Sequence, residues 1–198
     1  MSARRTRSDG ERSRSAILER AAQLATVEGI DGLSIGRLAD AVGMSKSGLY
    51  AHFGSKEELQ LATIETAYDV FRSKVLEPAA AAPSARERLD RLTSGYLSYI
   101  EDETFAGGCF FASVLAEVDT RPGPVRDRLV AFLGEWLGVV ESAIRDAQAE
   151  GSLAASEDPA QLTFELEAAI FLANAQFVVM RSSEPIDRAR RAIERRLA

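Results

Sequence analysis

The sequence predicts an all-α protein with nine helices: three short helices, a long connector and five further helices. Three observations lead to this fold class. Apolar residues recur three or four positions apart, strand-type alternation is almost absent, and Ser, Gly and Pro mark helix ends at short intervals. With 46% apolar residues among 198, the helices can enclose a substantial core.

The N-terminal part is expected to hold three helices and the start of the connector. Serines that precede apolar segments serve as N-caps and glycines as helix ends. These cap and end positions are Gly29, Ser34, Gly43 and Ser45. The inward-facing residues are Ile17, Ala21, Leu24 and Ala25 in the first helix and Ile35, Leu38, Ala39 and Val42 in the second. A capping box at Ser55–Glu58 begins the connector, which we expect to end near Leu76, before a break at Pro78–Pro83.

The C-terminal part repeats this pattern in longer helices. A second capping box at Ser84–Glu87 begins a helix that ends before Gly107, and a short apolar helix covers Phe110–Val118. A turn at Pro122–Pro124 leads into a long amphipathic helix that ends near Gly151. The last two helices are expected from Pro159, capped by Asp158, to about Arg181 and over Ile186–Leu197.

Composition excludes several classes of protein. A single cysteine, Cys109, rules out an intrachain disulfide and is expected to be a small buried apolar residue. The longest apolar run, Ala168–Met180, includes Asn174 and Gln176 and is shorter than the roughly 20 residues of a membrane span. The N-terminus has no basic-then-apolar leader. We therefore expect a soluble cytoplasmic protein with no membrane partner.

The charge of the chain is divided unevenly. The net charge is −6, but residues 1–56 carry nine Lys or Arg and six Asp or Glu, while the remainder carries 15 basic and 24 acidic residues. A locally basic start on an acidic body favours an anionic partner at that end. Because six of the nine basic residues lie among the first 20, a solvated arm remains an alternative explanation.

The second and third helices have the geometry of a helix-turn-helix. A small residue, Ala39, permits close crossing, and Gly43 permits the positive φ of a tight turn. Leu49 and Phe53 are expected to anchor the third helix to the core. The residues left to face outward are Lys46, Ser47, Tyr50 and Ala51. Gly48 would allow close approach of this helix to a DNA groove.

The segments SIGRLA at 34–39 and GMSKSGLYAHFGSKEEL at 43–59 resemble the N-terminal domain of TetR/AcrR-type transcriptional regulators. The resemblance covers residues 11–60. It implies an all-helical homodimer with one helix-turn-helix per subunit and a C-terminal sensing domain that binds a small molecule. The implied organisation is a flexible basic arm at 1–10, a helix-turn-helix domain at 11–56, a connector helix at 57–78 and a ligand-binding and dimerisation domain at 84–198.

The same resemblance implies the roles of the DNA-binding residues. Tyr50, His52 and Lys56 would contact backbone phosphates, and Lys56 would be aided by the helix dipole at the start of its helix. The capping residues Ser34 and Ser45 would place backbone amides near phosphates. The residues nearest to base edges would be Lys46, Ser47 and Gly48. Plainer alternatives remain open: a core or surface role for His52, a packing role for Tyr50, a surface role for Lys56, and a phosphate contact for Lys46.

Aromatic residues of the C-terminal part are candidates for an effector pocket: Tyr96, Tyr99, Phe110 and Trp136. Tyr96 and Trp136 each combine an apolar body with one polar atom that could orient a ligand. Their helical spacing is equally typical of core packing, which is the default interpretation for each.

The helix from Pro159 to Arg181 is apolar on all sides, as expected for a helix buried in a core or against another chain. Together with the last helix it resembles the dimer-forming pair of the family. The expected interface residues are Phe164, Ala168, Phe171, Leu172, Ala175 and Val179.

These observations predict a ligand-responsive DNA-binding regulator. The expected form is a repressor that binds a palindromic operator as a dimer and is released by a small apolar effector, although an activator is equally compatible with the sequence. An enzyme is disfavoured because no catalytic constellation, metal-ligand cluster or cofactor-binding loop is present. A helical interaction module that has lost DNA binding is disfavoured by the intact motif.

Overall fold

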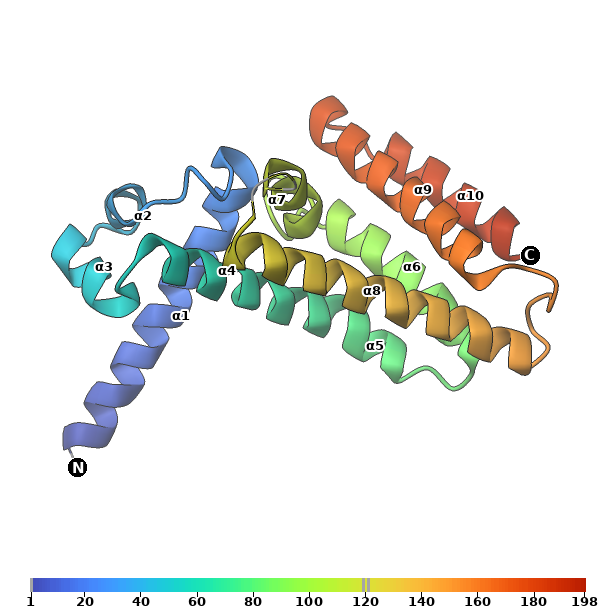
Figure 1. Ribbon diagram of the computed structural model, residues 1–198, viewed down its shortest axis with the longest axis horizontal. Coiled ribbons are helices and arrows are strands. Elements are labelled where there is room, and N and C mark those ends of the chain that lie inside the picture. The colour runs from blue at the N-terminus through green and yellow to red at the C-terminus, as the bar shows by residue number, and fades with distance from the viewer. Residues whose placement is uncertain (1, 119, 121) are drawn as a thin grey trace. The chain divides into compact units, whose positions relative to one another are not determined.

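The computed structural model describes residues 2–118, 120 and 122–198, with side chains from residue 12 onward. Within these residues every regular element is a helix (Figure 1). The elements are α1 (Ser2–Glu28), α2 (Ile35–Val42), α3 (Lys46–Phe53), α4 (Lys56–Phe71), the π-helical segment η1 (Arg72–Leu76), α5 (Glu77–Ala80), α6 (Ala85–Glu101), α7 (Phe110–Val118), α8 (Pro124–Ala149), α9 (Pro159–Met180) and α10 (Glu184–Leu197). Because α4, η1 and α5 follow one another without a break, the described residues form nine helices, and the predicted all-α class is confirmed.

The connector helix is longer than the sequence indicates. Its predicted end near Leu76 is wrong, because the helix continues through Pro78 to Ala80. The wider turn of η1 precedes the proline, and the N–H of Glu77 donates to the carbonyl of Arg72, five residues back. Pro78 has no N–H to donate, and it follows this π-helical turn at the start of α5, so the wider turn is where the continuous helix accommodates the proline.

The chain divides into two compact units. The first contains the chain up to Asp69 together with Phe105–Leu129, and the second contains Val70–Thr104 and Val130–Ala198. Helix α7 therefore packs with the N-terminal helices. The predicted basic arm at residues 1–10 falls largely on the start of α1, and the side chains of residues 1–11 lie outside the described part. The predicted domain boundaries remain predictions.

The core of the first unit joins α1, α2, α3 and α4. Leu38 and Ala39 of α2 and Leu49 and Phe53 of α3 are all buried, as predicted. They pack with side chains from α1 and α4, namely Ile17, Leu18, Ala21 and Leu59. Two anchoring residues spaced four apart are thus enough to fix the short helix α3 to the unit.

The core of the second unit is centred on an aromatic cluster. The ring of Phe71 lies edge to face against four other rings, with centroid separations of 5.1 to 5.5 Å. The four rings belong to Tyr96, Tyr99, Phe132 and Trp136. This geometry matches the preferred arrangement of aromatic pairs and ties α6 and α8 to the segment before η1.

Helices α9 and α10 lie side by side, and both pack on α6 (Figure 1). Arg196 of α10 pairs with Glu157 and Glu165. Its hydrogen bond lowers the pKa of the Glu157 carboxyl, and hydrogen bonds from Gln161 and then Arg196 lower the pKa of the Glu165 carboxyl. By length and composition alone, α9 could cross a membrane. The buried side of α9, which includes Leu162, Leu166 and Ile170, faces protein, and central helices of protein cores have the same composition.

Candidate nucleic-acid interface

The turn between α2 and α3 is fixed by backbone geometry and two serine caps. Ser34 Oγ accepts the N–H of Arg37 at 3.2 Å, and Ser45 Oγ accepts the N–H of Gly48 at 3.1 Å. Gly43 adopts the left-handed conformation with φ of 69°, and its N–H donates to the carbonyl of Ala39. The predicted caps and the predicted role of Gly43 are therefore confirmed, and the turn sets the direction of α3.

Helix α3 presents a polar face to solvent. Its exposed side chains are Lys46, Ser47, Tyr50 and Ala51. Tyr50 is 58% exposed, which excludes the alternative that it is a packing aromatic within this chain. The stem of Lys46 crosses Gly36 of α2, where a Cβ atom would come within 3.2 Å of Lys46 Cε. An eight-residue helix of about 12 Å fits the major groove of B-DNA.

Gly48 has a local role within α3. A Cβ atom at this position would lie 3.1 Å from Ser45 Oγ, the atom that caps the helix. A larger residue would therefore press on the cap as well as occupy space on the exposed side of the helix. Glycine at position 48 is therefore favoured for two reasons: it avoids crowding of the Ser45 cap, and it gives the clearance toward DNA that the sequence suggested.

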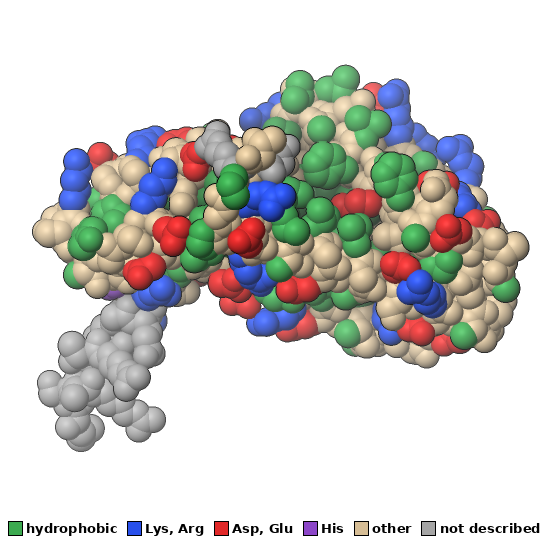
Figure 2. All heavy atoms as spheres, in the orientation of Figure 1, with side chains coloured by type: hydrophobic (Ala, Val, Ile, Leu, Met, Phe, Trp, Pro, Cys, Tyr) green, Lys and Arg blue, Asp and Glu red, His purple; other side chains and the backbone are tan. Residues whose placement is uncertain are grey.

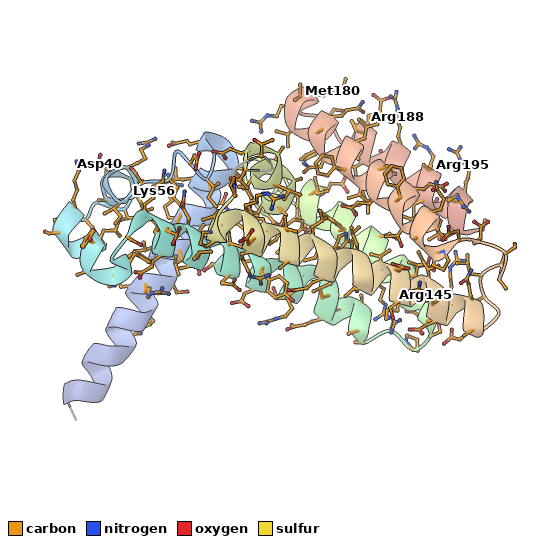
Figure 3. All side chains as sticks on the ribbon, in the orientation of Figure 1. Asp40, Lys56, Arg145, Met180, Arg188 and Arg195 are labelled. Atoms are coloured by element: carbon orange, nitrogen blue, oxygen red, sulfur yellow. The ribbon has the colours of Figure 1, made fainter. Side chains whose placement is uncertain are left out.

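His52 precedes the turn between α3 and α4, and Lys56 follows it. His52 is partly buried, with its ring 6.1 Å from that of Phe53. Lys56 lies at the start of α4 (Figure 3). Its Nζ donates to the carbonyl of Asp31 at 2.6 Å. Because an ammonium has three donors, this bond leaves two others with which Lys56 can bind a phosphate.

A residue that the sequence did not single out holds the turn between α1 and α2. The carboxylate of Glu117, on α7, accepts the N–H of Ile30 at 2.7 Å and the N–H of Asp31 at 2.9 Å. On the other side of this turn, Gln60 Nε2 donates to the carbonyl of Ile30 at 2.7 Å. Gly29, with φ of 81°, makes room, since a Cβ atom there would lie 2.7 Å from a Glu117 oxygen. Nothing in the sequence pairs positions 87 residues apart.

The structure brings together three of the four residues suggested for an effector pocket. Tyr96, Tyr99 and Trp136 are buried in the aromatic cluster of the second unit. Phe110 belongs to the first unit, where its ring packs against those of Phe105 and Phe111. Their ring contacts are those of core residues, in agreement with the default interpretation, and a role in binding an effector remains a prediction.

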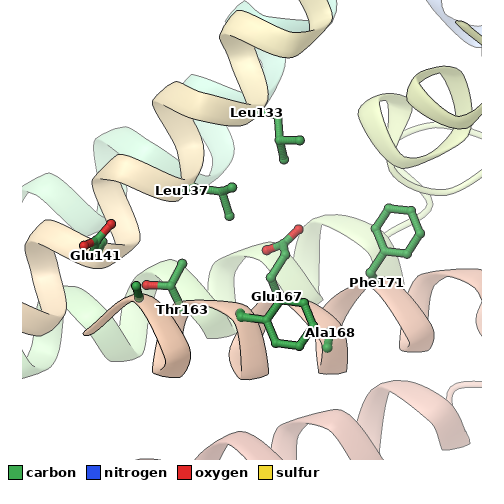
Figure 4. Close-up of a pocket in the computed structure, with 9 residues that line it drawn as sticks. Leu133, Leu137, Glu141, Thr163, Glu167, Ala168 and Phe171 are labelled. Carbon is green, nitrogen blue, oxygen red and sulfur yellow. The ribbon is translucent and has the colours of Figure 1, made fainter. Parts of the chain in front are cut away.

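A groove of about 470 Å³ lies between α8 and α9 (Figure 4). Its walls are mostly apolar and consist of Leu133, Leu137, Glu141, Ala160, Thr163, Phe164, Glu167, Ala168 and Phe171. None of the four suggested effector residues lines it. Trp136 is nevertheless connected to it, because its Nε1 donates to Glu167 Oε2 at 2.8 Å. Burial raises the pKa of the Glu167 carboxyl, and the bond from Trp136 opposes this rise.

All six residues expected at a dimer interface are exposed on one side of α9. Phe164 is 68% exposed, Leu172 58% and Val179 83%, whereas the apolar residues on the opposite side of α9 are buried. Figure 2 shows hydrophobic side chains gathered over this helix. Exposed apolar side chains in such a continuous group mark a surface for association.

Comparison with known proteins agrees with this architecture. Residues 17–63 match the bacterial regulatory proteins of the tetR family, and residues 85–193 match the tetracyclin repressor-like C-terminal domain. The transcriptional regulator AcuR of Cereibacter sphaeroides is 30% identical over 138 residues, which make up 68% of this chain and 62% of AcuR. The transcriptional repressor DhaR of Mycobacterium sp. strain GP1 is 24% identical over 86% of this chain and 85% of its own.

The fold has been solved in related regulators. A TetR transcriptional regulator from Chloroflexus aurantiacus superposes with a TM-score of 0.85 at 25% identity, over 93% of each chain. Family members are transcriptional regulators rather than enzymes. The matched N-terminal domain runs from α1 into α4 and contains the α2–turn–α3 surface, and the matched C-terminal domain spans α6 to most of α10. The chain therefore belongs to the TetR family of transcriptional regulators.

Proposed function

We propose that the protein is a cytoplasmic repressor that binds a palindromic operator as a homodimer and is released by a small apolar effector. The observation that carries this proposal is the exposed polar face of α3, held by buried Leu49 and Phe53. A short helix anchored by two residues, with Lys46, Ser47 and Tyr50 exposed to solvent, suits insertion into a major groove.

Each residue on this surface has a proposed role. Tyr50, His52 and Lys56 contact phosphates, and the helix starts capped by Ser34 and Ser45 present backbone amides to phosphates. Lys46, Ser47 and Gly48 lie nearest to base edges. Phosphate contacts supply most of the affinity, so binding weakens steeply as the salt concentration rises.

The dimer is proposed from the exposed face of α9. Its six interface residues lie four, three, one, three and four positions apart, which places them on one helical face. Homodimers are typical of the family. Two-fold symmetry would present two copies of α3 to two half-sites, so the operator would be a palindrome.

Release by an effector is a population shift. A molecule that binds better to a conformer with wrongly spaced α3 helices lowers the affinity for DNA. The repressor assignment draws on DhaR, which carries the name of a repressor at 24% identity.

The test is an in vitro transcription assay from the protein's own promoter region, combined with a mobility-shift assay on the same fragment. We expect the purified protein to shift the fragment and to lower transcription. A shift accompanied by increased transcription would make the protein an activator. No shift of this fragment, nor of fragments recovered by a genome-wide binding footprint, would contradict DNA binding altogether.

A further inference from the structure

The α8–α9 groove has the size and lining of a small-molecule site. Its volume of about 470 Å³ lies within the range of roughly 300–1,000 Å³ that is typical of ligand pockets. Leu133 and Leu137 form one wall, and Phe164, Ala168 and Phe171 form the other. Such a site binds the apolar body of a ligand and uses a small number of polar groups to orient it.

One polar group is directed across the groove. Figure 4 shows the carboxyl group of Glu167 reaching from α9 toward Leu133 and Leu137 of α8. The indole of Trp136 donates to Oε2 at 2.8 Å. Because a carboxylate offers about four acceptor positions, this single bond leaves Glu167 able to accept further hydrogen bonds.

The charges on the groove walls select the kind of ligand. Glu141 is the other ionisable residue among the nine that line the groove, and it pairs with Arg145 Nη2 at 2.5 Å. The lining contains no Lys or Arg. An anionic ligand would therefore meet a carboxylate without a compensating cation, whereas a cationic ligand would meet a complementary charge.

We propose that this groove binds a small apolar molecule that carries a protonated amine, with the ammonium donating to Glu167 and the apolar body lying between α8 and α9. The proposal gives the effector a place and a chemical class, and to that extent it rests on the proposed function. Glu167 is the residue that distinguishes amines from acids, and Trp136 orients its carboxylate.

The state of Glu167 agrees with this role. Burial disfavours its ionised form and raises its pKa. An ammonium group beside it would favour the ionised form again, so an amine gains both a charge-assisted hydrogen bond and an ion pair. Amine binding would accordingly weaken at acidic pH, where Glu167 holds its proton.

A second copy of the chain is a less suitable occupant of the groove itself. The exposed face of α9 that borders the groove is apolar, so a partner subunit would place apolar side chains over it. Those side chains would desolvate Glu167 further without offering it a donor, which is unfavourable for a carboxyl group. Of the six proposed interface residues, Phe164, Ala168 and Phe171 also line the groove, whereas Leu172, Ala175 and Val179 do not. Amine binding in the groove therefore requires that the last three residues carry most of the dimer contact.

The test uses adamantylamine as the probe and adamantane carboxylate as its counterpart of the same shape and opposite charge. Trp136 is the only tryptophan in the chain, so its fluorescence reports on the Glu167 side of the groove. We expect adamantylamine to change the emission saturably, while the carboxylate binds at least about tenfold more weakly, as the loss of a charge-assisted hydrogen bond implies.

Two variants refine the test. Glu167→Gln keeps the shape and an acceptor for Trp136 but removes the charge, and should weaken adamantylamine at least about tenfold. Glu165→Gln makes the same change two positions away, where the carboxylate pairs with Arg196 instead, and should leave the probe's affinity unchanged. If Glu167→Gln does not fold, the comparison of the two probes on the unaltered protein still shows whether the groove prefers an amine to a carboxylate.

Three results would overturn the inference: equal binding of both probes, full amine affinity in a folded Glu167→Gln protein, or no probe binding to the dimer because a second copy fills the groove. Operator binding is measured separately, without probe. The absence of operator binding would contradict the proposed function. Intact operator binding without probe binding would contradict only the proposal that the groove binds an amine.

Discussion

The carboxylate of Glu117 accepts the backbone N–H of Ile30 at 2.7 Å, and so attaches α7 to the turn that precedes the helix-turn-helix. The same carboxylate binds Asp31 N–H, while Lys56 and Gln60 bind the carbonyls of Asp31 and Ile30. The turn is therefore held by side chains from both α4 and α7. A displacement of α7 would be transmitted directly to the position of α2.

Glu117→Ala is expected to destabilise the protein by about 1.5–3 kcal/mol, because two backbone donors lose a charged acceptor. It should also weaken operator binding, although Glu117 lies outside the α3 surface. Glu117→Gln keeps one acceptor oxygen and should lose less on both counts. Urea unfolding and fluorescence anisotropy with operator DNA measure the two effects. Wild-type values for Glu117→Ala would show that this attachment is unimportant.

Gly43 offers a test of the turn itself. A Cβ atom there would meet nothing within 4 Å, so Gly43→Ala should cost only the left-handed backbone strain, about 1 kcal/mol or slightly more. Gly95, inside α6, has a negative φ and only ordinary contacts at 3.9 Å, so Gly95→Ala should stabilise by about 0.5–1 kcal/mol. Opposite signs in urea unfolding are the expected outcome, and equal signs would contradict the geometry of the turn.

Local sequence signals were sufficient for much of this architecture. Serine caps, a glycine at a left-handed position and apolar residues four apart predict the α2–turn–α3 unit, because each depends on neighbours within one or two helical turns. The exposed face of α9 was predictable for a related reason: a helix that is apolar on all sides has more apolar surface than its own unit can cover.

The remaining features depend on contacts between distant segments. Glu117 and Ile30 are 87 residues apart, and no periodic pattern connects them. The orientation of Glu167 depends on how α8 packs on α9, and the continuation of the connector through Pro78 depends on the π-helical turn before it. Tyr96, Tyr99 and Trp136, which were suggested for an effector site, lie in the cluster around Phe71. The sequence could not predict this cluster, because aromatic spacing alone does not distinguish a pocket lining from a packed core.

Leu172→Arg tests the dimer face. The side chain is 58% exposed, so the substitution should leave the subunit folded while placing a charge in the proposed apolar interface. Sedimentation should give a dimer for the parent and a monomer for the variant at micromolar concentration. Val27→Arg changes an exposed apolar residue of α1 and should remain dimeric. A monomeric parent, or a dimeric Leu172→Arg protein, would contradict the assignment.

The raised pKa of Glu167 predicts a pH-dependent stability. Below the ordinary pKa of a glutamate, about 4.3, the carboxyl is protonated in both the folded and unfolded states. As the pH rises, the unfolded chain ionises freely while burial opposes ionisation of the folded protein, so the free energy of unfolding falls until the pH exceeds the raised pKa. Relative to Glu167→Gln, the parent should lose stability over this interval in urea unfolding. A constant difference from about pH 4 to about pH 8 would contradict a burial-raised pKa.

The exposed face of α3 is proposed to bind DNA through phosphate contacts. Fluorescence anisotropy titrations of promoter DNA at a series of salt concentrations, with the parent, Tyr50→Phe and Tyr50→Ala, examine this binding. Tyr50 is exposed, so Tyr50→Ala should change the free energy of unfolding by no more than about 0.5 kcal/mol. We expect the parent's affinity to fall steeply with salt, Tyr50→Ala to bind about tenfold more weakly to every sequence tested, and Tyr50→Phe to show how much of this loss belongs to the hydroxyl. A salt-independent affinity, or a Tyr50→Ala protein that binds as tightly as the parent, would contradict the account.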